Sequence, residues 1–217
     1  MKNYGKIVAC LIAVWFLAVL AASAFQVFKT DPSQPPIALG LAVLIPIAAF
    51  ALWFRASEAF RRFVLAIDLR TLTFVQSWRI AGFVFVVLYL DRILPGLFAI
   101  PAGWGDIFIG LTAPFVALKL TDPSRRSSFL LWQALGILDL VVAVGTGAGA
   151  FLMDPHGIPT SPMTVLPLSL IPTFAVPLLL ILHLISIARA RLWPAQDYSS
   201  FAPPNNRSTS ALAGADV

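Results

Sequence analysis

Long apolar blocks alternate along the chain with short segments that carry charge, proline or glycine. The blocks approach or reach the roughly 20 residues that a helix needs to cross the hydrocarbon core of a bilayer. The segments between them have the composition of turns. The pattern predicts an all-α, polytopic integral membrane bundle of about six transmembrane helices in one domain, residues 1–192. The predicted spans cover about residues 7–28, 37–54, 71–90, 105–120, 128–148 and 164–187.

Two of the connecting segments have a distinct character. Residues 55–70 place apolar side chains at helical spacing beside Arg61 and Arg62. This is typical of an amphipathic helix at the cytoplasmic interface, and a plain linker fits as well. Residues 91–104 are apolar but contain two prolines and two glycines. Such a segment is either an outer loop or a re-entrant one, and a re-entrant backbone requires surrounding protein or water.

The basic residues indicate the orientation, because cytoplasmic segments retain Lys and Arg. With the N-terminus inside, only Lys29 and Arg92 fall outside, and Arg79 falls in the membrane. Both termini are therefore predicted to be cytoplasmic, with residues 193–217, rich in Pro, Ser and Asn, as a disordered cytoplasmic tail. The twelve predicted cytoplasmic residues are Lys2, Lys6, Arg55, Arg61, Arg62, Arg70, Lys119, Arg125, Arg126, Arg189, Arg191 and Arg207.

The first span also resembles a cleavable signal peptide. Lys2 and Lys6 precede an apolar run that ends at the small residues 22–24. The apolar stretch continues to Phe28, which favours an uncleaved helix. Cleavage near residue 24 would leave five spans in the same orientation.

Composition supports the membrane class and narrows the possible partners. The chain is 59% hydrophobic and 12% charged, against about 25% charged for a soluble domain. The net charge of +5 reflects the flanking basic residues, so we expect the lipid bilayer and no nucleic acid as a partner. Cys10 is the only cysteine, and His156 and His183 are the only histidines. We therefore predict no disulfide, metal site, haem or other cofactor.

The polar residues inside the predicted spans are the candidates for function. A charge at the bilayer centre costs at least about 2.5–3.5 kcal/mol, so such a residue usually has a partner. Counting along the spans at about 1.5 Å per residue places Arg79 and Asp139 near the midplane at similar depth. We predict that they pair, with Gln76, Gln133 and His183 completing a ligand or ion-pair site. The pair could equally serve only to fix the helix packing.

Two further features lie toward the outer side. Asp106 falls at the start of the predicted fourth span, where a carboxylate suits a helix N-terminus, so it is either an N-cap or an outer-mouth site. Pro167, Pro172 and Pro177 interrupt the sixth span at five-residue intervals. Each removes a helix hydrogen bond, which predicts a hinge, a lined cavity or a static kink.

The strings "QSWR", "PAGWGD", "LDLVVAVG" and "LIPTFAVPLLLILHL" together resemble a group of small polytopic bacterial membrane proteins to which no activity is assigned. The resemblance extends over most of the chain through the sixth span. It implies a multi-pass protein of the bacterial inner membrane. It implies no ligand or catalytic residue.

Three functions are compatible with these observations. The first is a small transporter or permease-like protein with a buried polar site around Arg79 and Asp139, for an unidentified small molecule. Its few helices favour a homo-oligomer. The second is a non-catalytic scaffold or subunit in which the ion pair fixes packing. The third is an intramembrane enzyme acting on a lipid or quinone, which is disfavoured because no catalytic motif, and hence no catalytic residue, is found.

Overall fold

Six apolar segments of the chain form helices long enough to cross a membrane, which confirms the predicted all-α polytopic fold. The structure is a computed structural model that describes residues 2–31, 34–154 and 156–193, and this part of the chain contains no strand. Apart from Trp193, the predicted tail lies outside the described residues. The six segments are Tyr4–Ala24, Ile37–Ala56, Leu69–Leu90, Gly96–Lys119, Pro123–Ala150 and Ile171–Ala190.

The first half of the chain forms a helical hairpin, a short helix and a composite span. Helices α1 (Lys2–Ala24) and α2 (Ile37–Ala56) make the hairpin, and α3 (Glu58–Leu65) follows. The third span changes character twice along its length. It consists of α4 (Leu69–Val75), the 3₁₀ helix η1 (Gln76–Gly82) and α5 (Phe83–Leu90).

The second half contains two long helices and an interrupted last span. Helix α6 (Gly96–Lys119) leads through the short η2 (Pro123–Arg125) into α7 (Arg126–Met153). The 3₁₀ helix η3 (Ser161–Thr164) precedes the last span, which consists of the π-helical η4 (Ile171–Ala175) and α8 (Val176–Ala190).

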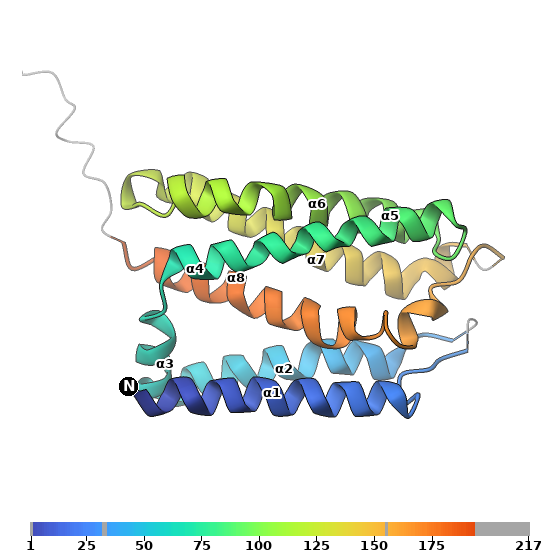
Figure 1. Ribbon diagram of the computed structural model, residues 1–217, viewed down its shortest axis with the longest axis horizontal. Coiled ribbons are helices and arrows are strands. Elements are labelled where there is room, and N and C mark those ends of the chain that lie inside the picture. Colours follow the sequence, from blue (N-terminus) through green and yellow to red (C-terminus); the bar gives the residue numbers. More distant parts are fainter. Residues whose placement is uncertain (1, 32–33, 155, 194–217) are drawn as a thin grey trace, which may run out of the picture.

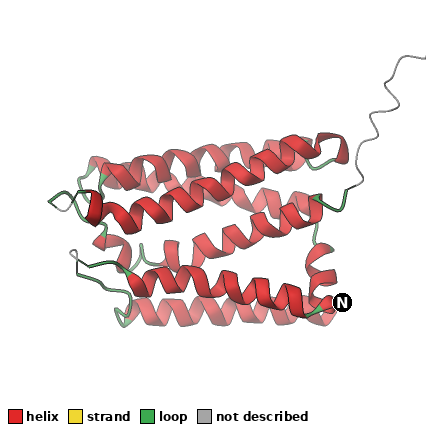
Figure 2. Cartoon of the chain, turned by 180° about the vertical axis from the view of Figure 1, so that it is seen from behind, coloured by secondary structure: helices red, strands yellow, loops and turns green. Residues whose placement is uncertain are grey.

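Helix α8 lies between two groups of helices (Figures 1 and 2). On one side are α4 to α7, in which α6 packs against the composite span and α7. On the other side is the α1–α2 hairpin, whose α2 contacts α8 and η4. Helix α1 packs chiefly on η4, where the rings of Trp15 and Phe16 contact Phe174. Helix α1 is therefore peripheral to the bundle.

Of the three apolar clusters in the described part of the chain, one lies toward each end of the bundle and the third joins α2, α7 and α8 through Val43, Leu140 and Val176. We call the end that holds the N-terminus and α3 the proximal end, and the end with the α1–α2 and α5–α6 connections the distal end (Figure 1). The proximal cluster includes Phe60, Leu72, Ile109, Phe129 and Ile185. The distal cluster consists of Phe85, Leu94, Phe98, Ala99, Ala102 and Met163. Between the two levels lie the buried polar residues of the third, fifth and last spans.

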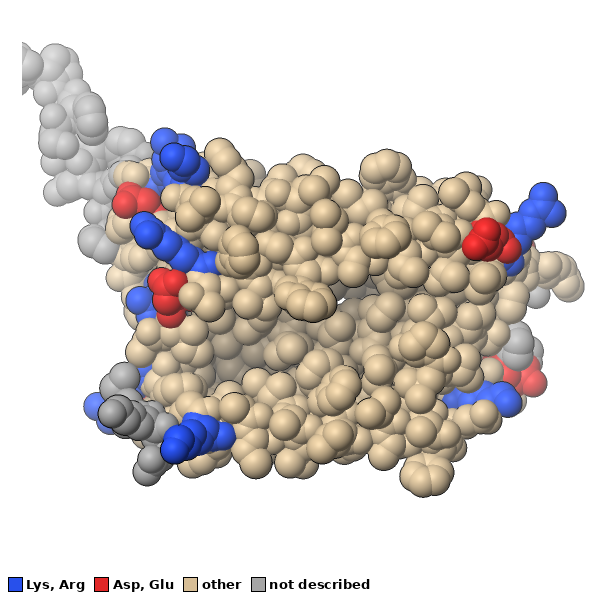
Figure 3. All heavy atoms as spheres, in the orientation of Figure 1, with Lys and Arg blue, Asp and Glu red and all other residues tan. Residues whose placement is uncertain are grey.

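On the face shown in Figure 3, charged side chains lie toward the two ends of the molecule, with an uncharged band between them. This is the distribution expected of a bundle whose middle faces lipid, because exposed charge in the hydrocarbon region is costly. Large apolar side chains such as Leu17, Leu52 and Leu111 are exposed on the long apolar helices. Burial of the band in lipid accounts for an apolar surface that would be unusual in a soluble protein.

The segment 55–70 contains an amphipathic helix, α3, rather than a plain linker. Ser57 caps its N-terminus by accepting a hydrogen bond from the Phe60 backbone N–H. Phe60 is buried and stacks on Trp53 of α2 at a ring-centroid distance of 3.8 Å. Asp68 caps α4 in turn, and the hydrogen bond from the Thr71 backbone N–H lowers the pKa of its carboxyl. The apolar face of α3 therefore packs on the protein itself.

The predicted boundary of the fourth span was wrong. Helix α6 begins at Gly96, so most of the segment 91–104 is helical and the re-entrant loop does not form. Pro95 precedes the first helical residue, and its carbonyl accepts the N–H groups of Phe98 and Ala99. Apolar packing against Phe85 holds this first part of the helix in place despite Pro101. The 24 residues of α6 span about 36 Å, enough for a full crossing.

The last span also begins later than predicted. Residues before η4 form turns, and the regular helix α8 starts only at Val176. In η4 the Val176 N–H donates to the Ile171 carbonyl, five residues back. Pro172 and Pro177 supply no N–H groups, so a continuous α-helical ladder cannot form here. The prolines therefore coincide with an irregular π-helical turn at the start of the last span, a conformation that was not among the predicted alternatives.

Candidate functional site

Arg79 is the centre of the buried polar residues. Its side chain is fully buried, and its Nε donates to Asp106 Oδ1 of α6 at 2.7 Å. Its Nη2 donates to Asp139 Oδ2 of α7. Its Nη1 donates to the Gly136 carbonyl of α7 at 3.1 Å and lies 3.3 Å from His183 Nε2 of α8. One guanidinium thus joins the third, fourth, fifth and last spans.

The 3₁₀ helix η1 is the element that positions Arg79. A 3₁₀ helix has three residues per turn, so side chains at i and i+3 lie directly above one another. Every third residue from Thr73 to Phe85 is buried, namely Thr73, Gln76, Arg79, Gly82 and Phe85. In a regular α-helix this row would turn steadily away from the core. The 3₁₀ geometry therefore keeps the polar row of η1 facing the bundle.

The site contains two carboxylates and one guanidinium. Asp106 and Asp139 both contact Arg79, and their side chains keep 16% and 14% of their surface accessible, whereas that of Arg79 keeps none. With both carboxylates ionised, the cluster carries one surplus negative charge in the membrane interior. Such a charge is unfavourable without a compensating proton or cation. The surplus therefore distinguishes this cluster from a simple ion pair.

His183 is held in one neutral form by its neighbours. A guanidinium has no hydrogen-bond acceptor, so His183 Nε2 accepts from Arg79 Nη1. The proton of the ring is then on Nδ1, which donates to Gln133 Oε1. His183 is fully buried. Gln133 thus supports the ion-pair cluster indirectly, through its hydrogen bond with His183.

Gln76 takes a different position from the one predicted. Its Nε2 donates to the Leu179 carbonyl of α8 at 3.2 Å, so it ties η1 to the last span. Within the described residues, Gln76 Oε1 and Gln133 Nε2 are buried without a hydrogen-bond partner. Buried polar atoms are usually paired, so these two retain hydrogen-bonding capacity beside the cluster.

Three glycines make room for the charged and imidazole side chains. A Cβ atom at Gly105 of α6 would overlap the Asp139 carboxylate, and one at Gly136 of α7 would overlap the His183 ring. A Cβ atom at Gly82 of η1 would overlap the Asp106 carboxylate. The absence of a Cβ atom at these three positions therefore lets the helices approach closely around the cluster.

Asp106 is the functional candidate that sequence reasoning placed incorrectly. It lies eleven residues into α6 and contacts Arg79, so it is neither the N-cap of the helix nor an outer-mouth residue. The sequence signal that could have corrected the position of Asp106 was the length of the predicted fourth span. Sixteen residues are too few for a crossing, and extending the span toward residue 96 would have brought Asp106 to the depth of Arg79.

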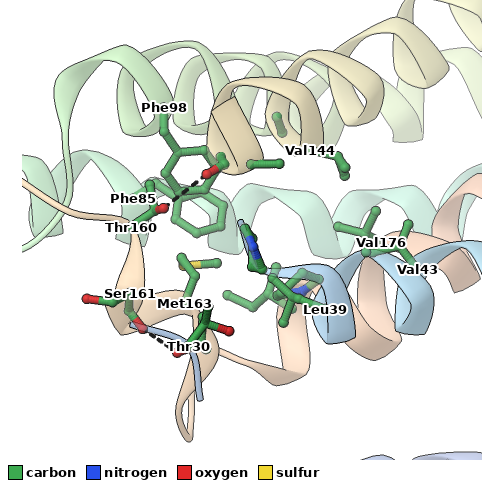
Figure 4. Close-up of a pocket in the computed structure, with 18 of the residues that line it drawn as sticks. Thr30, Leu39, Val43, Phe85, Phe98, Val144, Thr160, Ser161, Met163 and Val176 are labelled. Atoms are coloured by element: carbon green, nitrogen blue, oxygen red, sulfur yellow. Dashed lines mark hydrogen bonds between the residues drawn. The ribbon is translucent and has the colours of Figure 1, made fainter. Parts of the chain in front are cut away.

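An apolar pocket leads from the distal end to Asp106. Its volume is about 100 Å³, and its lining includes Asp106 together with residues of α2, α5, α6, α7 and η4. The rings of Phe85 and Phe98 form one wall, with Met163 beside them and Leu39 of α2 opposite (Figure 4). The charged residues among the described lining are Asp31, near the mouth, and Asp106. The pocket therefore connects the partly accessible carboxylate with the distal surface.

No group of three or more His, Cys, Asp or Glu side chains that could hold a metal ion occurs in the described part of the chain.

Comparison with known proteins identifies one family. A profile described as a domain of unknown function, DUF8737, matches residues 34–191. The match covers helices α2 to α8 and all residues of the Arg79 cluster, and α1 precedes it. No curated protein and no solved structure matches the chain.

Proposed function

The chain belongs to the DUF8737 family, and since that description carries no activity, we propose from the site that the protein is a small proton-coupled membrane carrier. Its buried site consists of Arg79, Asp106, Asp139 and His183. In this proposal the surplus carboxylate carries a proton when the site has no ligand and releases it when a ligand binds. The localisation we propose is the bacterial inner membrane.

One observation carries this proposal, namely two carboxylates on one guanidinium at a site that a pocket reaches. An ion pair that only fixes helix packing needs one carboxylate per guanidinium and gains nothing from accessibility. Here Asp106 forms part of the pocket lining, while Arg79 is fully buried behind it. An intramembrane charged residue beside a cavity is typical of a substrate or proton pathway.

The arrangement also supports access from one side at a time. The pocket opens toward the distal end, and the proximal cluster of Phe129, Ile109 and Ile185 closes the other half of the bundle. The irregular segments η1 and η4 flank the central level. Mid-helix 3₁₀ and π segments are frequent at functional hinges. We propose that they change conformation when access switches to the proximal side.

The orientation is testable by cysteine labelling, and we propose that the proximal end is cytoplasmic. In a Cys10→Ala background, a membrane-impermeant maleimide applied to intact cells should label Gln34→Cys and not Ser124→Cys. Permeabilised cells should label both, because both positions are exposed in the structure. Labelling of Ser124→Cys alone in intact cells would overturn the orientation.

The carrier proposal is testable in proteoliposomes that contain a pH-sensitive dye. With an acidic interior and the membrane potential clamped at zero, we expect one charge class of organic solute, cationic, zwitterionic or anionic, to change the internal pH. The change should be at least tenfold slower with Asp106→Asn. Asp91→Asn is the matched control, since Asp91 is an exposed carboxylate outside the site. Folded wild-type protein that moves protons with none of the three classes would overturn the proposal.

A further inference from the structure

The pocket has the chemistry of a site for a positively charged ligand. Both charged residues in its described lining are acidic, and the remaining lining is apolar or carries neutral hydroxyl and amide groups. The nearest basic group, Arg79, already donates to both carboxylates. An anionic ligand would meet carboxylate at the inner end, whereas a cation would meet complementary charge.

The apolar wall favours an organic cation over a hydrated inorganic one. Phe85 and Phe98 stand at 66° to each other with ring centroids 5.4 Å apart, and both line the pocket. A cation within about 6 Å of such a ring face is attracted by its quadrupole. Leu140, Val144 and Val176 complete an apolar surface that would not replace the water shell of a small metal ion.

Size limits the ligand further. The pocket volume of about 100 Å³ is of the order of an apolar cavity of about 150 Å³ that accepts benzene. Phe98 and Asp106, which both line the pocket, are about 12 Å apart along the axis of α6. A single aromatic or short branched alkyl group joined to an ammonium head matches these dimensions.

We propose that the pocket binds a small hydrophobic ammonium ion, with its apolar group between Phe85, Phe98 and Leu39 and its charged head at Asp106. This assignment rests on the proposed carrier function, of which it names the substrate class. The Arg79 hydrogen bond engages Asp106 Oδ1, so Oδ2 is the oxygen that we assign to the ligand. The cation supplies the positive charge that the cluster needs. The proton that it displaces leaves through the pocket to the distal solution.

The charged and titratable groups around Asp106 support the exchange of its proton for the cation. Arg79 of η1 contacts Asp106 directly, Asp139 of α7 lies on the other side of the same guanidinium, and His183 of α8 is neutral. A guanidinium is always charged in proteins, and the neutral His183 ring accepts from Arg79 at Nε2 and donates to Gln133 at Nδ1. The two carboxylates therefore share the proton that the cation replaces.

The test uses phenyltrimethylammonium, whose charge does not depend on pH, and the full chain in phosphatidylcholine nanodiscs. Calorimetric titration, corrected with empty nanodiscs, should show saturable binding with release of protons, measured in two buffers of different ionisation enthalpy. The uncharged isostere tert-butylbenzene and the anion benzenesulfonate should bind at least tenfold more weakly. Equal binding of the cation and its uncharged isostere would overturn the proposal.

Two variants separate the charge from the cavity. Asp106→Asn should weaken cation binding at least tenfold and abolish proton release, with Asp91→Asn as the control that binds normally. Gly40→Phe should also weaken binding at least tenfold, because Gly40 lines the pocket and a Cβ there meets nothing within 4 Å. This variant fills the pocket and leaves the Arg79 cluster intact. Unchanged binding in Gly40→Phe would show that the cation binds elsewhere.

The outcomes distinguish this assignment from the carrier proposal. Cation binding without proton movement in proteoliposomes would preserve the binding site and overturn the carrier. Proton movement with a zwitterionic or anionic solute, and no binding of phenyltrimethylammonium, would preserve the carrier and overturn the cation assignment.

Discussion

Replacing Arg79 alone by methionine should lower the free energy of unfolding by about 3–5 kcal/mol, the usual cost of removing one partner from a buried ion pair. The substitution leaves Asp106 and Asp139 facing each other without a cation. It also removes the donors to the Gly136 carbonyl and to His183 Nε2. Thermal unfolding of the purified protein, followed in detergent, measures the change.

The triple variant Arg79→Met/Asp106→Leu/Asp139→Leu tests the same electrostatic argument. Replacing a whole buried charge cluster by apolar residues of similar volume is often neutral or stabilising. We therefore expect the triple variant to be more stable than Arg79→Met alone. It should lack proton-coupled transport, whereas a scaffold would keep its function.

Arg79→Lys tests how much of the stability comes from the hydrogen bonds of the guanidinium and how much from its charge. Lysine retains the charge but cannot reproduce the planar guanidinium, which here contacts groups on three helices. Its stability should lie between the wild type and Arg79→Met. If Arg79→Met unfolds at the wild-type temperature, the cluster does not hold the helices together.

The pairing of Arg79 with Asp139 was predictable because depth follows from counting residues. Both spans run in the same direction, and their boundaries were close enough for a midplane estimate. Two ionised side chains at one depth in hydrocarbon have few alternatives to each other. The same count of residues predicted that His183 and Gln133 belong to the site. In the structure these two side chains are hydrogen-bonded to each other.

Asp106 was not predictable by that method, because its depth depends on where α6 begins. Pro95, Gly96, Pro101 and Gly103 all argue for a loop on local propensity. In the protein, apolar packing of Phe98 and Ala102 in the distal cluster overrides this propensity. A count that starts from the wrong boundary then places the carboxylate at the membrane surface instead of beside Arg79.

The 3₁₀ conformation of η1 was likewise absent from the sequence prediction. An α-helix and a 3₁₀ helix of seven residues have the same hydrophobic character, so composition cannot separate them. The row of Thr73, Gln76, Arg79 and Gly82 at intervals of three was a usable signal. Only a helix with three residues per turn buries the whole row on one face.

The structure indicates which part of the chain the site requires. The matched family region starts at residue 34, and every member of the cluster lies within it. Helix α1 contacts the rest of the protein through Trp15 and Phe16 on Phe174 and through Tyr4 on Phe63, and none of these side chains belongs to the cluster. Its contribution therefore belongs to the packing around η4 and α3 and not to the chemistry of Arg79.

The close approach of α6 and α7 at Gly105 is the second feature on which the site depends. A Cβ atom there would overlap the Asp139 carboxylate. Asp139 would have to turn away from Arg79, or the two helices would have to separate. Overpacking of this kind typically costs about 1–3 kcal/mol, and the lost ion pair adds to it. By contrast, a Cβ atom at Gly145 of α7 meets nothing within 4 Å.

Gly105→Ala should therefore lower the free energy of unfolding by at least about 2 kcal/mol and slow proton-coupled transport at least tenfold. Gly145→Ala, the matched control, should be neutral or more stable by up to about 1 kcal/mol, because alanine favours the helix at both positions. Thermal unfolding in detergent and the proteoliposome assay measure the two effects. If the cost arises from the overlap with Asp139, then Gly105→Ala/Asp139→Ala should be no less stable than Asp139→Ala, since the colliding carboxylate is gone. Additive losses in this double-mutant cycle would contradict the overlap, because residues that do not interact lose stability independently.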